Sequence, residues 1–538
     1  MCSLNRFIKI DFRLLAFIAF VFCSSSCTNN KDTYSIIDFG AKADSTIINT
    51  KFINDAIHTC NKNGGGTVIV PSGTYSTGTI ELLSNVNLHL EAGAKLMGSR
   101  DTSDYKPMPN ILFDEGYNRY GLIYAVEAKN ISITGQGEIN GNGTYFMNGI
   151  DKPHMGHDWD RKYVRQGEAY MKDGEIFEDG PVSYNFRPGM LLFIERCENV
   201  KILDVSLNDS PEWTVRLQDS DNAEFRGVTI ETNPLIPNSD GIHCTSSRNI
   251  RISDCHIFAG DDAIIVTGFG EGIMPGDSID EAKFIGNKTG YAENVVVTNC
   301  VLSSRSACIR VGYGQHPIRN LIFSNIIMHS SNRGIGVFAR DNSSIENVLF
   351  DNIIIQTRLH SGHWWGKGEA IHVSAVKDTE LGKVGTINNV RFSNIIATSE
   401  TGMLVYGSEE SIIENISFQN VQLTINNGKY TETYGGNFDL RPAASKDKAL
   451  FKHDVPGFYA QHVKNLSLTG LKVTWSEGLP DFFTNGVEIN HFDGLRIENF
   501  TGGPVFTRKG LSAIKLSNGI HAELKLNTNT TLQKENVK

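Results

Sequence analysis

Proline is scarce in this sequence, with 15 residues among 538, so the chain is not a Pro-rich linker protein. The 52 glycines instead indicate an ordered chain with many turns. Long basic runs are absent and the net charge is −10, which disfavours nucleic acid and anionic membrane surfaces as partners. Cys-x-x-Cys and Cys/His spacings are absent too, so we expect no metal and no other cofactor.

The apolar run near the N-terminus, Leu14 to Phe22, is too short to span a membrane and has the basic flank of a signal peptide. Small residues before Cys27 resemble a bacterial lipoprotein cleavage box, which implies lipidation of the Cys27 thiol. Ordinary cleavage without a lipid is the alternative. We expect residues 1–26 to be removed. The mature chain would be a monomer exported to the periplasm or anchored to the outer membrane, touching membrane only through the lipid.

Six cysteines remain beyond this segment, at positions 60, 197, 244, 255, 300 and 308. An exported protein can pair them as disulfides. Cys255 and Cys300, however, occupy the same position of the repeat described next. Buried, stacked free thiols are therefore the favoured interpretation.

One nine-residue pattern recurs along the chain: Asn, aliphatic, any, apolar, any, Asn/Asp/Gly, aliphatic or Cys, any, aliphatic. It begins at Asn199, Asn222, Asn249, Asn294, Asn320, Asn347, Asn389, Asn415 and Asn465. The short spacings of 23 to 27 residues match either leucine-rich repeats or a β-solenoid. Alternating β-branched residues favour strands, with a sharp bend at the Asn/Asp/Gly position. The sequence therefore predicts one all-β domain over residues 33–521, a right-handed parallel β-helix.

Both ends of the solenoid have their own patterns. Thr50 to Cys60 has helical apolar spacing and stops at Gly64 to Gly66, which predicts a helix capping the first coil. Residues 142–185 lack the repeat and are interpreted as an insertion. Residues 522–538 are rich in Asn, Thr and Lys and are expected to be a loosely held polar tail.

Three aspartates stand about one repeat apart: Asp240 in Asn238-Ser239-Asp240-Gly241, and the pair Asp261 and Asp262 after Gly260. On a coiled chain the 21-residue offset brings all three carboxylates to one face. Clustered like charges raise one pKa, so that one carboxyl stays protonated as an acid while another acts as a base. Such a set can catalyse cleavage at a sugar bond.

Five short segments form a set of motifs in this order: Asp38-Phe39-Gly40-Ala41, Val70-Pro71-Ser72-Gly73-Thr74-Tyr75, Ser210-Pro211-Glu212-Trp213, Asn238-Ser239-Asp240-Gly241 and Gly260-Asp261-Asp262. With these motifs the chain resembles glycoside hydrolase family 28, the polygalacturonase family. The resemblance implies inverting hydrolysis, with Asp261 as general acid and with Asp240 and Asp262 activating the attacking water. Asn238 is a candidate substrate-binding residue of the same motif.

Other family motifs are altered. Ala307 stands where the family His would be, and Gly336 and Phe338 stand where its Arg and Lys would be. In the family, the Arg and Lys bind the galacturonate carboxylate. Strict polygalacturonate specificity is therefore not expected for this chain. Replacement cations are available nearby, either as a carboxylate clamp or as solvated turn residues: Arg305, Arg310, Arg333 and Arg340. Arg310 and Arg333 are favoured because they lie nearest the predicted cleft.

The loop from Arg358 to Glu369 contains His363, adjacent Trp364 and Trp365, and Lys367. Adjacent tryptophans on a strand would face opposite sides, so an exposed loop that stacks on sugar rings is favoured over simple loop packing. A loop of this kind would wall one end of the cleft and favour exo action.

We therefore predict a hydrolase of a pectin-type, galacturonate-containing polysaccharide or oligosaccharide. A polysaccharide lyase and a glycan-binding β-helix without activity are the alternatives.

Overall fold

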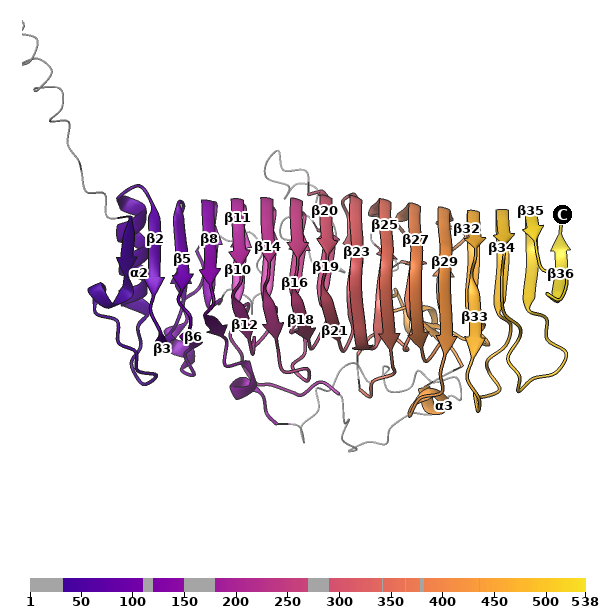
Figure 1. Ribbon diagram of the computed structural model, residues 1–538, viewed down its shortest axis with the longest axis horizontal. Coiled ribbons are helices and arrows are strands. Elements are labelled where there is room, and N and C mark those ends of the chain that lie inside the picture. The colour runs from indigo at the N-terminus through magenta and orange to yellow at the C-terminus, as the bar shows by residue number, and fades with distance from the viewer. Residues whose placement is uncertain are drawn as a thin grey trace, which may run out of the picture.

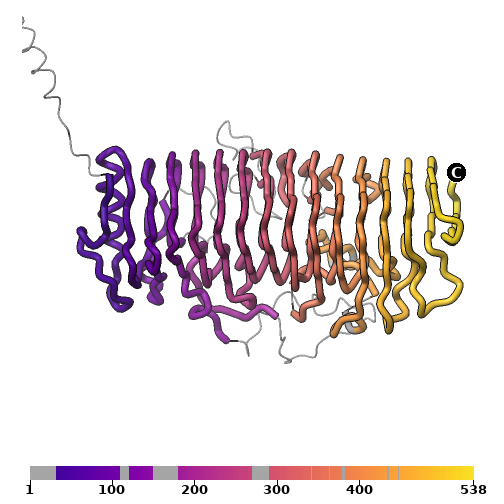
Figure 2. Tube along the Cα trace, viewed as in Figure 1, coloured from indigo at the N-terminus to yellow at the C-terminus, as the bar shows by residue number. Residues whose placement is uncertain are grey.

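The computed structural model describes residues 32–109, 120–149, 180–269, 290–340, 342–362, 364–377, 382–434 and 436–538. Strand after strand stacks along the long axis of the molecule (Figure 1), and the Cα trace advances rung by rung from the N-terminal to the C-terminal end (Figure 2). The paired strands run parallel, apart from the short β30–β31 pair. The predicted parallel β-helix is confirmed.

Each coil contributes strands to three long sheets. The first sheet contains β4 (Ile80–Glu81), β7 (Ile123–Val126), β10 (Leu192–Glu195), β13 (Val215–Gln218), β16 (Ile242–Thr245), β19 (Ile264–Gly268), β22 (Ala307–Gly314), β24 (Arg333–Ala339), β26 (Ile371–Ala375) and β28 (Met403–Tyr406). The second contains β1 (Thr33–Ser35), β2 (Gly66–Val70), β5 (Val86–Leu90), β8 (Lys129–Gly135), β11 (Glu198–Leu203), β14 (Asp221–Arg226), β17 (Arg248–Ser253) and β20 (Ala292–Thr298). The third contains β3 (Gly73–Thr77), β6 (Ala94–Gly98), β9 (Glu138–Asn140), β12 (Ser206–Asn208), β15 (Thr229–Glu231), β18 (His256–Ala259) and β21 (Val301–Ser304).

Farther along the chain, single bent strands serve two sheets at once. They are β23 (Ile318–Ser331), β25 (Ser344–Thr357), β27 (Thr386–Ser399), β29 (Ile413–Ile425), β32 (Phe458–Thr469), β34 (Val487–Glu498) and β35 (Ile514–Lys525). The remaining elements are β30 (Phe438–Asp439), β31 (Leu450–Phe451), β33 (Lys472–Trp475), β36 (Leu532–Val537), α2 (Thr50–Lys62), α3 (Thr431–Tyr434), α4 (Lys446–Ala449), η1 (Ile36–Phe39), η2 (Thr102–Asp104) and η3 (Gly143–Phe146).

The repeated asparagines form a ladder along the outside of the bends. Asn199, Asn222, Asn249 and their successors all adopt left-handed backbone conformations, with φ between 53° and 60°. Asn tolerates this conformation better than most residues because its short polar side chain bonds locally. The side-chain amides also bond from coil to coil: Asn222 Nδ2 donates to Asn199 Oδ1 at 2.7 Å and Asn389 Nδ2 to Asn347 Oδ1 at 2.8 Å. The ladder fixes the register of successive coils.

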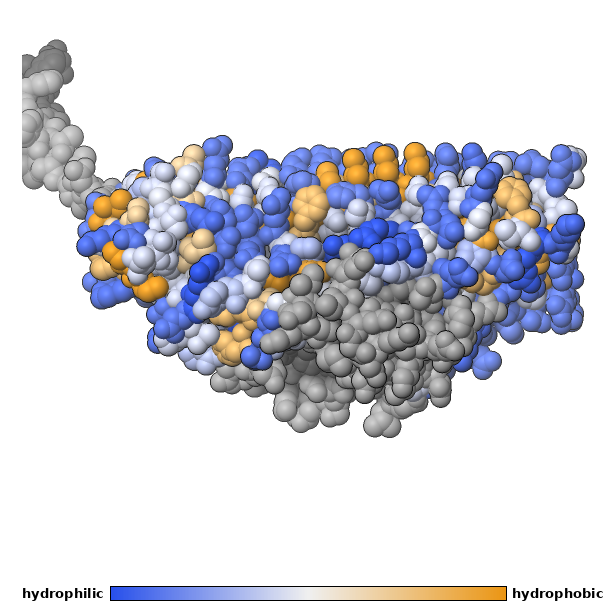
Figure 3. Space-filling view, turned by 90° about the horizontal axis from the view of Figure 1, so that it is seen from below, coloured by the Kyte–Doolittle hydropathy of each residue, from blue (hydrophilic) through white to orange (hydrophobic). Residues whose placement is uncertain are grey.

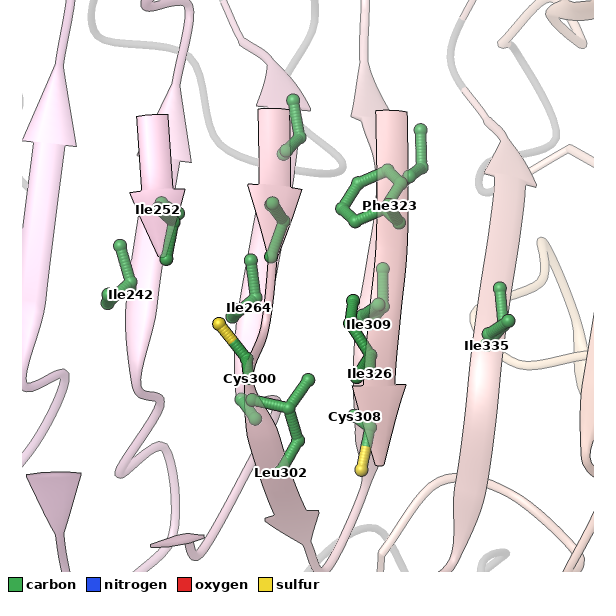
Figure 4. Packing of buried hydrophobic residues seen from close by; sticks show 14 of the residues in the cluster. Ile242, Ile252, Ile264, Cys300, Leu302, Cys308, Ile309, Phe323, Ile326 and Ile335 are labelled. Atoms are coloured by element: carbon green, nitrogen blue, oxygen red, sulfur yellow. The ribbon is translucent and has the colours of Figure 1, made fainter. Parts of the chain in front are cut away.

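Inside the solenoid, equivalent side chains stack in line. Ile242, Ile264, Ile309 and Ile335 come from consecutive strands of the first sheet and form one such file (Figure 4). A second file holds four phenylalanines that stack with ring centroids 4.8–4.9 Å apart: Phe323, Phe350, Phe392 and Phe418. The six cysteines beyond the N-terminal segment are buried and free, as predicted.

The outer surface seen from below is largely hydrophilic, with a short row of hydrophobic residues along the long axis (Figure 3). The expected N-terminal cap is present: α2 buries Ile53, Ala56 and Ile57. No helix in the described ranges is long and apolar enough to cross a membrane.

The expectation of a loose polar tail was wrong for the last residues. Residue 522 lies within β35, and β36 pairs in parallel with β35 as a further coil. The asparagine ladder continues through this coil, because Asn536 Nδ2 donates to Asn518 Oδ1 at 3.2 Å. Polar composition concealed the strand because both faces of β36 are exposed.

Candidate active site

The three aspartates of the sequence prediction lie at the entrance to two neighbouring strands of the first sheet. Asp240 precedes β16, whereas Asp261 and Asp262 precede β19, which pairs with β16. Backbone hydrogen bonds link the two approaches: Gly241 N donates to Asp262 O at 2.9 Å, and Gly260 N to Ser239 O at 3.2 Å. The coil geometry therefore brings the three carboxyl groups into one cluster.

The two glycines of these motifs permit that close approach. A Cβ atom on Gly241 would lie 2.3 Å from Ala263 O, and one on Gly260 would lie 2.3 Å from Ser239 Oγ. Real Cβ atoms do not approach other atoms so closely, so any other residue would push the two coils apart. Each Asp-Gly or Gly-Asp pairing thus reflects steric need at the cluster.

Asp262 is held in place by two hydrogen-bond donors. Its carboxylate accepts hydrogen bonds from Arg310 Nε and, at 2.8 Å, from Ala307 N. The nearby carboxylates, Asp262 foremost, raise the pKa of Arg310. Arg310 Nη1 also donates to Gly312 O at 3.0 Å, and the guanidinium lies 4.5 Å from the Tyr313 ring centroid. The sequence predicts Arg310 as a clamp for the substrate carboxylate. In the structure, its Nε instead donates to Asp262 within the protein.

Asp261 has the properties of a proton donor. Burial, followed by repulsion from Asp262, raises the pKa of Asp261 to about 7. Burial and the charges of Asp261 and Asp262 likewise raise the pKa of Asp240. A carboxyl group with a raised pKa, Asp261, therefore lies beside one that is paired with Arg310, an arrangement that suits general acid/base catalysis. Across the described ranges, no three His, Cys, Asp or Glu side chains are arranged to hold a metal ion.

His243, on β16, is the imidazole nearest the cluster. Its Nδ1 lies 3.7 Å from Asp240 Oδ2, and its ring centroid lies 4.8 Å from that of Trp213. The Arg216 guanidinium also lies over the Trp213 ring, 4.4 Å from its centroid. Ala307, by contrast, offers only its backbone N–H to Asp262.

Arg187 fastens the turn that carries Asn238 and Asp240. Its Nη1 donates to Pro211 O at 2.9 Å and to Pro237 O, and its Nη2 donates to Asn238 Oδ1 at 3.1 Å. Arg187 is buried, so these bonds are shielded from water. Asn238 itself is exposed at the surface of the turn.

The altered basic motif has a structural explanation. Phe338 lies across Gly336, where a Cβ atom would be 2.4 Å from the ring. Arg333 is buried and donates from Nε and Nη2 to Glu369 Oε1, at 2.8 and 2.6 Å. His372 Nδ1 contacts the same oxygen at 3.0 Å. The position of the family's clamp is therefore filled by an aromatic ring and a buried ion pair.

Arg340 is completely buried and bonds to backbone carbonyls of a distant segment. It donates to Pro442 O at 2.8 Å and Leu440 O at 3.0 Å. Asp439 in that segment accepts from Arg441 and, at 3.0 Å, from Gly366 N. Arg340 thus holds residues 440–442 against β26, whereas Asp439 bonds the same segment to the tryptophan loop, residues 358–369.

The tryptophan loop is less exposed than predicted. Trp364 is 6% exposed, so the expectation of an open stacking face does not hold for this ring. Its backbone oxygen accepts a hydrogen bond from Arg441 Nη2 at 3.3 Å. Trp365 is 37% exposed, with its ring centroid 6.4 Å from that of Tyr313. Lys367 is buried, and His363 lies outside the described residues.

Arg305 lies at an open groove of about 490 Å³ beside the cluster, together with Arg358 and Phe258. Ser304, also in this groove, donates from Oγ to Asp261 O at 2.6 Å. Arg305 Nη1 contacts His360 Nδ1 at 2.8 Å. Arg305 and Arg358 therefore both line this groove.

Sequence reasoning missed Arg187, Arg216 and His243. His243 follows Asp240 by three residues in the strand that the motif introduces, and that spacing is a usable signal. Arg187 gives no such signal, because its contacts depend on turns 24 and 50 residues away.

Comparison with known proteins gives consistent matches. The family model described as "Glycosyl hydrolases family 28" matches residues 60–438. A probable polygalacturonase of Vitis vinifera is 32% identical over 242 residues, which are 43% of this chain and 43% of that protein. An exo-poly-alpha-D-galacturonosidase of Dickeya chrysanthemi is 24% identical over 442 residues, 72% of this chain and 71% of that protein.

Among solved structures, the Yersinia enterocolitica family 28 exopolygalacturonase has a TM-score of 0.60 and 20% identity, covering 88% of this chain and 79% of its own. This likeness supports the fold. The match with the Vitis protein spans less than half of that relative's length.

Proposed function

The chain belongs to the glycosyl hydrolases of family 28, and from this membership we propose that it cleaves galacturonate-containing pectic chains or oligosaccharides from one end, with inversion at the anomeric carbon. One observation carries the proposal: Asp261, with a pKa raised to about 7, lies beside Asp262, which accepts hydrogen bonds from Arg310 and the Ala307 amide. An acid and a base are thus ready in one site.

In the proposed reaction, Asp261 donates its proton to the glycosidic oxygen as the bond to the leaving sugar breaks. A water molecule attacks the anomeric carbon from the opposite side, and its proton passes to the carboxylates of Asp240 and Asp262. The half-buried position of Asp261 suits contact with a substrate oxygen, whereas Asp262 is deeper and fixed by two donors. Inversion requires room for the water between the carboxyl groups.

Exo action is supported by the covered surfaces on both sides of the cluster. Toward the N-terminus, the outward-facing Phe193 and Arg216 of the first sheet are buried. Toward the C-terminus, Phe338 and His372 are buried, beside the segment that Arg340 fastens. Covered surfaces on both sides of the cluster favour binding of a chain terminus over binding of the middle of a polymer.

An acidic sugar is supported by the cations around the cluster and by the relatives, which are named for polygalacturonate. Arg305 and Arg358 line the adjacent groove, and guanidinium groups match carboxylates in bidentate geometry. We include Asn238, Trp365 and Lys367 as further substrate-contacting candidates of this proposal. Arg333 is a weaker candidate because Glu369 already neutralises it.

The substrate and the mode of cleavage are tested together. The purified protein is incubated with pectic polymers and oligosaccharides, both uronic and neutral, and products are followed by reducing-end detection and viscosity. We expect small products from the start and slow loss of viscosity. By NMR, the first product to appear should have the anomeric configuration opposite to that of the cleaved bond. Rapid thinning with mixed oligomers would contradict exo action, and an unsaturated, ultraviolet-absorbing product would indicate a lyase.

The pH dependence follows from Asp261. Because its raised pKa is about 7, the fraction of protonated acid falls about tenfold per pH unit above that value. We expect kcat/KM on a short oligosaccharide to fall with this slope above about pH 7. A substrate whose leaving group needs no protonation should lose far less rate over the same range. Flat kcat/KM to pH 9 with both substrates would contradict the assignment.

We also propose that the protein is exported and anchored through lipid on Cys27, because its N-terminal segment has signal-peptide character. The mass of the mature N-terminus measures this directly. A free Cys27 thiol on the secreted chain would contradict the anchor.

A further inference from the structure

His243 places an unused hydrogen-bonding nitrogen next to the catalytic cluster. The ring is 2% exposed, and within the described part of the chain its Nδ1 makes no hydrogen bond. The Oδ2 atom of Asp240 lies 3.7 Å from this nitrogen. An unpaired buried polar atom costs about 1–3 kcal/mol, so a small closure that forms this bond is favourable.

The rest of the ring is fixed by its surroundings. Thr267 Oγ1 lies 3.4 Å from Nε2, and the Trp213 ring packs against the imidazole. Thr267 Oγ1 also lies 3.1 Å from Thr245 Oγ1. When the Thr245 hydroxyl donates to Thr267, the Thr267 hydroxyl is free to donate to Nε2, which leaves the ring proton on Nδ1. This tautomer directs an N–H group at Asp240.

The charges around the pair define the state of each group. Those that face His243 and Asp240 from the neighbouring coils are Glu212, Arg216, Asp261, Asp262 and Arg310. Burial, then Arg216 and Arg310, lower the pKa of His243 well below its usual value, so the imidazole is neutral. For Asp240, by contrast, burial and the neighbouring carboxylates of Asp261 and Asp262 raise the pKa and favour the protonated form.

We propose that His243 is a positioning residue for Asp240: its Nδ1–H donates to Asp240 Oδ2 and holds that carboxyl ionised and aimed at the attacking water. The inference rests on the proposed function. When the water attacks the anomeric carbon, its proton goes to Asp240 and the leaving oxygen takes the proton of Asp261. The imidazole gains no proton in this step. Its hydrogen bond favours the ionised form of Asp240, so that the proton of the cluster resides on Asp261.

The test compares three substitutions. His243→Leu removes both ring nitrogens, His243→Asn keeps an amide donor near the Nδ1 position, and His243→Gln places the donor near the Nε2 position. We expect His243→Leu to lower kcat about 10–100-fold with little change in KM, and to move the acid limb of the pH profile upward by about one unit. His243→Asn should restore the limb, whereas His243→Gln should not. His256→Leu, on the exposed face of β18, is the matched control and should keep the wild-type profile.

The interaction with Asp240 is isolated by a double-mutant cycle. In an Asp240→Asn background, His243→Leu should cost no further activity, because the group it acts through is gone. Additive losses, a wild-type acid limb in His243→Leu, or equal behaviour of the Asn and Gln variants would each overturn the proposal.

A readout without activity separates this inference from the proposed function. Losing the donor raises the folded-state pKa of Asp240 further above its unfolded value, so stability is lost over a wider range as pH rises. The unfolding midpoint of His243→Leu should therefore fall more steeply from pH 4 to 8 than that of the wild type, and His243→Asn should follow the wild type. If no pectic substrate is cleaved, the proposed function fails while this comparison still decides the role of His243. Parallel midpoints for the Leu variant and the wild type would overturn it.

Discussion

Asp261→Asn is expected to reduce hydrolysis by about 10²–10⁴-fold while making the folded protein more stable above neutral pH. The loss of activity follows because an amide cannot donate the proton that the leaving sugar oxygen needs. The gain in stability follows because the variant no longer buries a third negative charge beside Asp240 and Asp262. Rates on an oligosaccharide and urea unfolding at pH 5 and pH 8 measure the two effects.

The sign of the stability effect comes from the raised pKa. In the wild type, Asp261 titrates near pH 7 in the folded chain and near its ordinary value of 3.8 when unfolded. The folded state therefore holds more protons between these values, and wild-type stability falls as pH rises through them. The variant lacks this fall, so its advantage should reach about 2 kcal/mol at pH 8 and vanish near pH 4. Equal pH dependence, or wild-type turnover, would refute the assignment of Asp261 as the acid.

Arg310→Met should produce the largest structural effect of any substitution near the site. Asp262 would lose its main partner and remain buried next to two other carboxyl groups. Breaking a buried ion pair on one side typically costs about 3–5 kcal/mol. We also expect at least about 100-fold lower kcat, because Asp262 loses the donor that positions its carboxyl group. Urea unfolding and single-substrate kinetics measure both losses.

Two further variants separate this role from a substrate clamp. Adding Asp262→Asn to Arg310→Met should recover much of the stability but none of the activity, because the unpaired charge is gone and so is one of the two carboxylates proposed to activate the water. Arg310→Lys should fall between the wild type and Arg310→Met, since an ammonium group cannot reproduce the donor pattern toward Asp262 and Gly312. If Arg310 served only the substrate, KM alone would rise and the unfolding midpoint would not move.

The solenoid could be predicted because its determinants are local and repeated. Each asparagine bend and each alternating strand carries the same pattern, so nine copies support one interpretation. The last coil was not predicted because the residues of Leu532–Val537 are mostly polar and exposed. Only the pairing with β35 identifies this segment as a strand. Terminal coils need not bury both faces, so their composition departs from the repeat.

The site was predictable where function follows from short motifs and not where it depends on long-range contacts. Asp240, Asp261 and Asp262 were found because solenoid geometry turns a 21-residue offset into proximity. The partners of Arg310 and Arg333 were not, since Asp262 and Glu369 are 48 and 36 residues away and either arginine could have faced solvent. The hydrogen bond from Arg441 to the Trp364 carbonyl joins residues 77 positions apart, and no local pattern indicates it.

The asparagine ladder tolerates large differences in loop length. Asn249 and Asn294 are 45 residues apart, yet their side chains bond at 3.1 Å, much as Asn199 and Asn222 do across 23 residues. An insertion between coils therefore leaves the register of later coils intact. In evolutionary terms, the cleft walls and the carboxyl cluster can diverge independently: loops can be exchanged to admit a new sugar while the acid and base keep their places.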